Sequence, residues 1–196
     1  MENDIRRKKG RYFVRFVGID PSTKTGFVAL DERLNVLVAK ELKGIGNKDP
    51  KRMVTLIENV SSFTEISDYV CIEGMPFSTQ RAITTGGIHH GIRNELFKNG
   101  IGYREVAPNA VKKYVSVTGW KGEVGNKKRL TGKEKKLAVM DAVKQHFGFI
   151  NKNDNIVDAY IIARIGLNLY MLEEGLESID KEIYQLEVLH SILNKE

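Results

Sequence analysis

The sequence predicts an α/β protein built on one mixed five-stranded sheet flanked by helices. Three observations predict this fold class. Three strand-like segments with short turns between them open the chain, two strand-helix units follow, and further helical segments complete it. Antiparallel strands followed by parallel βα units build one mixed sheet with helices on both faces. At 196 residues, the chain is long enough for one domain with a sizeable core.

The opening strands are predicted from β-branched and aromatic residues bounded by turns. Tyr12–Ile19 is followed by the turn cluster Asp20–Thr23. Gly26–Leu30 and Val36–Leu42 are two further strands, and Asp31–Asn35 forms the turn between them. We expect these three strands to form an antiparallel meander.

Two strand-helix units follow in the middle of the chain. Pro50 opens a helical pattern, and Tyr69–Ile72 is a short apolar strand that ends at Glu73. A helix over about Thr84–Lys98 leads to a strand at Gly102–Val106. These two strands are expected to be the parallel part of the sheet.

The remaining residues are mostly helical, with one long loop between the helices. Pro108 starts a helix and Gly119–Gly132 is a glycine- and lysine-rich loop. Further helices are predicted at Glu134–Phe147, Asn153–Met171 and Glu177–Leu193.

Composition excludes several classes of protein. The single Cys71 excludes a disulfide framework and a cysteine-based zinc site. The charged start Met1–Lys9 is unlike a signal peptide, and no apolar run approaches the roughly 18 residues that cross a bilayer. We expect a soluble, cytoplasmic protein with no membrane partner. It should have a basic arm (1–11), one domain (12–173) and a C-terminal helix (174–196) that continues the same domain.

The charge is polarised along the chain. Val111–Lys136 holds nine basic residues against Glu123 and Glu134, a net charge of +7, so the rest of this +6 chain sums to −1. A second basic cluster lies at Arg6–Arg11, whereas Met171–Glu196 holds seven acids against two lysines. The basic middle segment favours a polyanionic partner, and a solvated loop and helix face are the alternative.

Four acidic residues lie where predicted strands or helices begin or end. Asp20 follows the first strand and Glu73 the fourth, so their carboxylates converge if these strands are neighbours. Asp154 and Asp158 are four residues apart and share one helix face. Asp154 alone is also where a helix cap is expected. Asp158 lies within the apolar run Ile156–Ala163, where a carboxylate is costly unless it is paired or bound to a metal.

Converging carboxylates point to a particular chemistry. Their mutual repulsion raises their pKa values unless divalent cations neutralise them. All-oxygen sites suit Mg²⁺ or Mn²⁺, and two such ions about 4 Å apart activate water and stabilise the leaving oxygen in phosphodiester hydrolysis. Together with the basic segment, the acids indicate a metal-dependent nuclease.

The segments around these acids also form an ordered set of motifs. Gly18–Gly26, Ile72–Gly74 and Asp154–Ala163 each contain one or two of the acids, and the basic stretches Pro108–Lys113 and Lys133–Val139 lie between the second and the third. In this order and spacing the segments resemble the motifs of RuvC-type Holliday junction resolvases, especially the phage versions.

The resemblance covers about Val14–Leu169 and implies an RNase H-like fold, a homodimer and nicking of Holliday junctions and related branched DNA such as flaps and Y-forks. It implies a bacterial or phage-infected cytoplasm and about two Mg²⁺ ions in each active site, for which Mn²⁺ can substitute. Many members have an acid at the position of Asn155, for which Asp154 is the expected substitute. The implied metal ligands are Asp20, Glu73, Asp154 and Asp158, and Lys133 and Lys136 complete the catalytic set.

Other residues are candidates for contact with DNA. Phe77 follows Pro76 near the acids, where it would stack on an opened base, with a core position as the alternative. Trp120 in the basic loop has the same two interpretations. His89 and His90 are adjacent, so their side chains diverge and cannot chelate one ion from a regular helix. The expected DNA contacts are Lys24, Phe77, Lys112, Lys113, Lys127, Lys128 and Arg129.

Two other functions stay open at this stage. An Asp…Thr-x-x-Gly pattern after a strand also occurs in actin-like and sugar-kinase-type ATPases, although these need a second homologous domain. A non-catalytic branched-DNA-binding protein would carry the same basic charge.

The C-terminal segment carries an apolar stripe whose spacing alternates between four and three. This pattern is typical of a helix-helix seam between subunits, but the same stripe suits a helix that folds back on its own sheet. The stripe consists of Leu172, Leu176, Ile179, Ile183, Leu186, His190 and Leu193.

Overall fold

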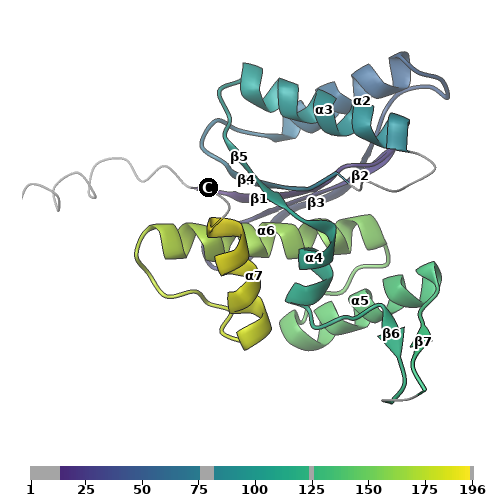
Figure 1. The fold of residues 1–196 in the computed structure, drawn as a ribbon. Coiled ribbons are helices and arrows are strands. Elements are labelled where there is room, and N and C mark those ends of the chain that lie inside the picture. The colour runs from purple at the N-terminus through teal and green to yellow at the C-terminus, as the bar shows by residue number, and fades with distance from the viewer. Residues whose placement is uncertain (1–13, 76–81, 124–125, 195–196) are drawn as a thin grey trace, which may run out of the picture.

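The computed structural model describes residues 14–75, 82–123 and 126–194. In this part of the chain, a five-stranded sheet lies between two layers of helices (Figure 1). The expected basic arm over residues 1–11 lies outside the described residues.

The sheet confirms the predicted fold class. Its strand order is β3-β2-β1-β4-β5. β2 runs antiparallel to β1 and β3, whereas β4 runs parallel to β1 and β5. The strands are β1 (Phe16–Asp20), β2 (Lys24–Leu30), β3 (Val36–Lys43), β4 (Tyr69–Glu73) and β5 (Tyr103–Val106).

Two helices cover one face of the sheet and a long central helix covers the other (Figure 1). α2 (Lys51–Phe63) and α3 (Ala82–Lys98) form the first layer. α6 (Asp154–Glu173) lies across β1, β2 and β4, and three further helices pack against its outer side. These are α4 (Pro108–Tyr114), α5 (Gly132–Phe147) and α7 (Ile183–Leu193).

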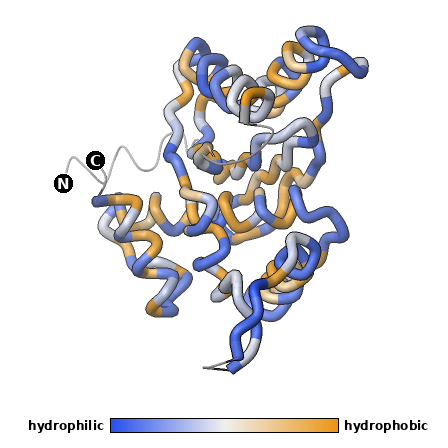
Figure 2. Tube along the Cα trace, turned by 45° about the vertical axis from the view of Figure 1, so that its right-hand side comes forward, coloured by the Kyte–Doolittle hydropathy of each residue, from blue (hydrophilic) through white to orange (hydrophobic). Residues whose placement is uncertain are grey.

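The core is densest around α6. Its side chains are buried on all sides from Ile156 to Leu169, apart from the partly buried Asp158. A helix that is apolar all round belongs in the centre of a layered fold. Figure 2 shows this concentration of hydrophobic residues along α6 and the sheet. None of the helices described here has both the length and the apolar character needed to cross a membrane.

The register of the sheet brings two of the predicted acids to one edge. Ile19 of β1 pairs with Ile72 of β4 in a parallel ladder, so the next residues, Asp20 and Glu73, lie side by side at the carboxyl ends of the two strands. This edge is where the candidate site forms.

Two glycines allow α6 to lie directly on the sheet. A Cβ atom at Gly18 would overlap the backbone of Ala159, and one at Gly26 would overlap the backbone of Asn155. Only a residue without a side chain permits such close backbone approach. Because Asp158 lies between these two contact points, the glycines also fix how near α6 brings this carboxylate to the strand ends.

The structure corrects the prediction of a plain loop over Gly119–Gly132. A short hairpin forms there, in which β6 (Trp120–Lys121) pairs antiparallel with β7 (Lys128–Arg129) and projects away from the helices (Figure 1). Strands of two residues are too short to show the alternation by which strands are recognised in a sequence.

The structure also corrects the start of the last helix. α7 begins at Ile183 and not at Glu177, because the preceding residues fold inward. Ser178 and Asp180 are buried, and the backbone N–H groups of Ile179 and Asp180 donate to the side-chain oxygen of Asn168 at 2.7 and 3.0 Å. These bonds hold the segment in a non-helical path.

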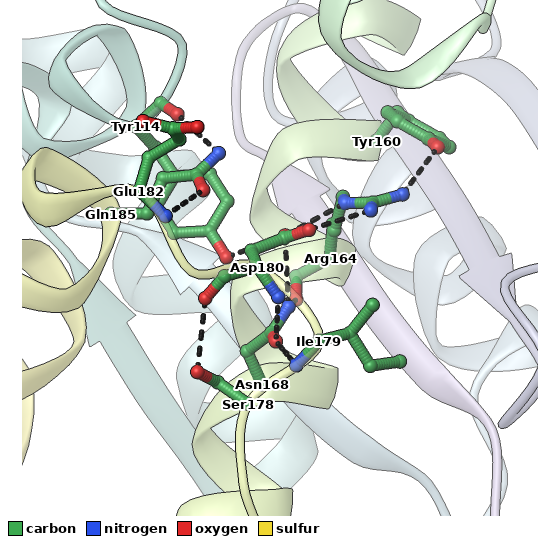
Figure 3. A network of polar contacts seen from close by, with 9 residues as sticks. All are labelled: Tyr114, Tyr160, Arg164, Asn168, Ser178, Ile179, Asp180, Glu182 and Gln185. Carbon is green, nitrogen blue, oxygen red and sulfur yellow. Dashed lines mark hydrogen bonds and ion pairs between the residues drawn. The ribbon is translucent and has the colours of Figure 1, made fainter.

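A buried network fixes this segment to the rest of the fold (Figure 3). The guanidinium of Arg164 donates to both carboxylate oxygens of Asp180, at 2.8 and 2.6 Å. The hydroxyl of Tyr114 donates to the same carboxylate at 2.7 Å. Residues of α4, α6 and the turn before α7 are thereby joined through one side chain.

The expected apolar stripe is therefore not one helical seam. Leu176, Ile179 and Ile183 are exposed, and the first two precede α7. The buried face of α7 is formed by residues such as Val188 and Leu189, which join the core cluster around α6. The prediction of one continuous seam is wrong. α7 folds back on its own domain, but it packs against α4 and α6 rather than directly on the sheet.

Candidate active site

Three carboxyl groups from distant parts of the chain meet at the edge of the sheet. Asp20 ends β1, Glu73 ends β4, and Asp158 lies one turn into α6. Asp20 and Glu73 share a hydrogen bond, and Asp158 interacts electrostatically with both. The structure thus brings together three of the four carboxylates considered from the sequence.

Burial and mutual repulsion raise the pKa of all three groups. The pKa of Asp20 lies well above its usual range because the carboxyl is buried and lies beside Glu73. Burial and Asp158 raise the pKa of Glu73 to about 7, and burial and Asp20 raise the pKa of Asp158 to about 7. The ammonium of Lys112 opposes the pKa shift at each of the three groups. A bound cation would relieve the remaining repulsion.

Asp154, the fourth candidate, is held by a lysine. Its carboxylate lies 2.5 Å from the ammonium of Lys136 on α5. Asp154 also raises the pKa of Asp20 and Asp158, which shows that it lies near them. Asp154 therefore borders the acidic cluster and carries its own counter-ion.

The first residues of α6 are anchored by an acid that sequence reasoning missed. Asn153 is the N-cap, which corrects the expectation of a cap at Asp154. The side-chain amides of Asn153 and Asn155 donate to Glu41 of β3 at 2.5 and 3.2 Å. Together with Lys43, they lower the pKa of Glu41 to about 2.

Glu41 had a detectable signal in the sequence. It lies within the predicted strand Val36–Leu42, and the observed register places it in the same row of the sheet as Asp20, with Gly26 between them. Many RuvC-type resolvases have an acid at the position of Asn155. In this chain the side-chain amide of Asn155 donates a hydrogen bond to Glu41 on the edge strand β3, a bond that an ionised acid could not donate.

The carboxyl groups of the cluster fit a hard divalent cation. Within the described residues, no three His, Cys, Asp or Glu side chains stand in a ready-made metal-ligand arrangement. Mg²⁺ does not require one, since it usually keeps several waters and binds through one or two carboxylates. Asp20, Glu73 and Asp158 offer such oxygens, and none of them forms an ion pair with a described residue.

A cavity of about 230 Å³ opens beside Asp154 and Asp158. Its wall is strongly basic, because it includes lysines from both α4 and α5. An anionic group placed there would lie between ammonium groups and the carboxylates. The lining residues are Lys112, Gly132, Lys135, Lys136, Val139, Met140, Asp154, Val157 and Asp158.

The lysines considered from the sequence fall into separate groups. Lys112 and Lys136 lie at the acidic cluster, whereas Lys113 forms a 2.6 Å ion pair with Glu187 of α7. Lys24 is exposed at the start of β2, and Lys133 is exposed in the first turn of α5. The exposed Lys127, Lys128 and Arg129 lie on or beside β7 of the hairpin.

The aromatic and histidine residues considered from the sequence differ in how exposed they are, and one of them lies outside the described residues. Phe77 lies outside the described residues, whereas Trp120 on β6 is 55% exposed. His89 is buried and His90 is exposed, so the two side chains diverge as expected. Burial lowers the pKa of His89 to about 4.

Comparison with solved structures identifies the fold. A structure described as "T. thermophilus RuvC in complex with Holliday junction substrate" matches with a TM-score of 0.52 and 15% sequence identity, covering 84% of this chain and 97% of that one. The chain has the RuvC fold. A further structure of Thermus thermophilus RuvC matches with a TM-score of 0.49 and 16% identity, covering 84% of this chain and 98% of that one.

At the level of sequence, no family model and no curated protein matches the chain. The RuvC fold is thus recognised from the structure, while the catalytic interpretation depends on the residues at the sheet edge.

Proposed function

We propose that this protein is a structure-selective DNA endonuclease that nicks Holliday junctions and related branched DNA by metal-dependent phosphodiester hydrolysis. The observation that carries the proposal is the convergence of Asp20, Glu73 and Asp158 beside a lysine-lined cavity, on the RuvC fold. An acidic cluster supplies a site for cations, and the neighbouring lysines supply a site for phosphate.

The metal ligands in this proposal are Asp20, Glu73 and Asp158, with Asp154 at the margin. Two Mg²⁺ ions, or Mn²⁺ in their place, are the expected cofactors, which would lower the pKa of the attacking water and stabilise the leaving oxygen. The carboxyl proton shared by Asp20 and Glu73 must leave before both groups can act as ligands.

The basic residues orient the DNA in this proposal. Lys112 and Lys136 flank the cavity next to Asp158 and would hold the scissile phosphate, supported by Lys133 from the first turn of α5. Hydrolysis then forms a bond between water oxygen and phosphorus and breaks one phosphodiester P–O bond. Phosphates farther along the duplex arms would contact Lys24, Lys113, Lys127, Lys128 and Arg129.

A homodimer is part of the proposal, because a four-way junction has two equivalent strands to cut and a two-fold assembly presents one site to each. Sedimentation at micromolar concentration tests this, and a monomer bound to junction DNA would contradict it. The single free Cys71 is buried, which is consistent with the reducing cytoplasm of a bacterial or phage-infected cell.

The deciding experiment is incubation of end-labelled four-way junctions with the protein in Mg²⁺ or in EDTA. We expect paired nicks near the branch point in Mg²⁺, and binding without nicking in EDTA. Binding without nicking in both buffers would favour the non-catalytic branched-DNA-binding protein. Neither binding nor nicking, together with thermal stabilisation by ATP, would favour the actin-like ATPase.

A further inference from the structure

A second cavity, of about 440 Å³, lies next to the proposed active site. It is formed by α4, the turn that follows α4, the first turns of α5 and the start of α7. Pockets of about 300 to 1,000 Å³ hold small-molecule ligands, so a single nucleotide fits this size. The lining residues are Asn109, Lys112, Lys113, Ser116, Val117, Thr118, Gly119, Lys135 and Tyr184.

The charge of the lining selects an anionic ligand. Lys112, Lys113 and Lys135 contribute three ammonium groups, and the described lining includes no carboxylate. Lys113 is held at the side of α7 by its 2.6 Å ion pair with Glu187. A phosphate that enters the cavity would therefore meet the ammonium groups of Lys112 and Lys135 and compete with Glu187 for the third.

The uncharged part of the lining suits a nucleoside. Asn109, Ser116 and Thr118 carry side chains that both donate and accept hydrogen bonds. Tyr184 adds an aromatic ring and Val117 an apolar surface. A base has the matching combination of flat faces and a polar edge.

Hydrogen bonds join two walls of the cavity. Tyr114, on the buried side of α4, donates to Asp180, and the amide of Gln185 on α7 donates to the backbone carbonyl of Tyr114 at 3.3 Å (Figure 3). The turn that follows α4 contains Ser116 at φ 58°, a left-handed conformation that a non-glycine residue adopts only at a cost. The buried network thus ties together α4 and α7, the two helices that line opposite parts of the cavity.

The cavity adjoins the proposed active site. Lys112 and Lys135 line both this cavity and the smaller one that contains Asp158. A DNA strand whose scissile phosphate lies at the carboxylates would therefore pass directly beside the larger cavity.

We propose that this cavity binds one nucleotide of the cleaved strand, next to the scissile phosphate, with its phosphate at the lysines and its base against Tyr184. The proposal rests on the endonuclease function proposed above and extends it, because a base held in a defined pocket gives cleavage a base preference at one position.

The first test does not depend on cleavage. The isotope-labelled protein, in EDTA, is titrated with each of the four deoxynucleoside 5′-monophosphates and with inorganic phosphate, and amide chemical shifts are followed by NMR. We expect shifts confined to the residues that line the cavity, in α4, residues 116–119, the first turns of α5 and the start of α7, and at least one nucleotide that binds tighter than inorganic phosphate. Shifts elsewhere, no shifts, or equal affinity for phosphate and all nucleotides would overturn the proposal.

The second test measures cleavage of four-way junctions with randomised bases around the branch point. Wild-type protein should prefer one base at one position near the cut, and Tyr184→Ala should lower cleavage of the preferred junction by about 5- to 150-fold, the equivalent of one base-aromatic stack, and thereby reduce the preference. Tyr184→Phe keeps the ring and should keep most of the preference. A preference unchanged in Tyr184→Ala would overturn the role of the cavity.

A third variant shifts binding in the opposite direction. Glu187→Gln frees Lys113 and should tighten nucleotide binding by several fold, whereas Glu177→Gln should have no effect. Glu177 is a matched control, since it also forms a 2.6 Å ion pair with a lysine, Lys181, away from the cavity. Should junctions not be cut at all, the endonuclease proposal fails, and the NMR titration with these variants alone decides the cavity.

Discussion

The carboxyl groups of Asp20 and Glu73 share a hydrogen bond across the ends of β1 and β4. Both groups are largely buried and Asp158 lies beside them. The fold therefore holds three acids where burial and repulsion disfavour their charged forms. Such an arrangement destabilises the protein without a cation and creates affinity for one.

Asp20→Asn should abolish nicking and preserve junction binding. Removal of one carboxylate weakens cation binding and lowers the rate by about 100-fold or more, while repulsion of the DNA phosphate decreases. Nicking in Mg²⁺ and binding in EDTA, measured on the same labelled junction, check both parts.

Asp141→Asn on α5 is the matched control, because Asp141 is exposed and belongs to no described ion pair. Normal nicking by Asp20→Asn at ordinary Mg²⁺ concentrations would remove Asp20 from the site. Asp154→Asn should have a weaker effect than Asp20→Asn, since Asp154 is paired with Lys136.

The stabilising effect of removing an acid should grow with pH. In the folded protein the pKa values of Glu73 and Asp158 are both about 7, whereas free carboxyl groups titrate at about pH 4. From about pH 4 to 7 the folded state retains protons that the unfolded state has released, so these groups lower the free energy of unfolding as pH rises.

Asp158→Asn should therefore raise the unfolding temperature at pH 8 by about 2 to 4 °C for each kcal/mol of repulsion removed. It should have little effect at pH 4, where Asp158 is protonated in the folded state. Scanning calorimetry at both pH values measures the difference. An equal gain at pH 4 and pH 8 would show that charge is not its cause.

Lys112 should matter more for cleavage than its neighbour Lys113. Lys112 opposes the charge of all three central carboxylates, whereas Lys113 is paired with Glu187. Lys112→Ala should lower the nicking rate and flatten the log-log salt dependence of binding by about one unit. Lys113→Ala should lower the rate less. Equal rates for the two variants would contradict this assignment.

The hairpin should bind phosphate without regard to sequence. Lys121 and Lys128 lie opposite each other across β6 and β7, a like-charge pair that an anion would stabilise. The triple variant Lys127→Ala, Lys128→Ala, Arg129→Ala should reduce the log-log salt slope of junction binding by about one unit for each phosphate that the hairpin no longer neutralises. A wild-type slope would exclude the hairpin from the interface.

The Asp180 network should dominate the stability of the C-terminal part. Asp180→Ala leaves the buried Arg164 without its partner, which costs about 3 to 5 kcal/mol and lowers the unfolding temperature by about 6 to 20 °C. Calorimetry checks this against Lys181→Ala, which removes only an exposed ion pair. A change no larger than that of Lys181→Ala would show that Arg164 finds another partner.

Local patterns in the sequence were sufficient for the sheet and for two of its acids. Apolar, β-branched segments that end in turns marked the ends of β1 and β4, and therefore placed Asp20 and Glu73 at strand ends. Alternation and turn chemistry are properties of neighbouring residues, so they can be recognised without the fold. Asp158 was recognised for a similar reason, as a charge within an apolar helix.

Long-range pairing lay beyond these patterns. The apolar stripe predicts a helix from Glu177, but Asp180 turns inward and accepts two hydrogen bonds from Arg164. Glu41 was missed because its partners Asn153 and Asn155 come from the far end of the chain. In both places tertiary hydrogen bonds override local propensity.

The order of residues along the chain was enough to predict the opening meander, the concentration of positive charge and the residue types available for cation binding. Which of these residues act together depends on how the helices pack. Lys112 and Lys113 are adjacent and chemically identical, yet one lies at the carboxylates and the other pairs with Glu187. The reason is geometric: successive side chains on a helix point in directions about 100° apart, and what each one meets depends on the elements packed around α4.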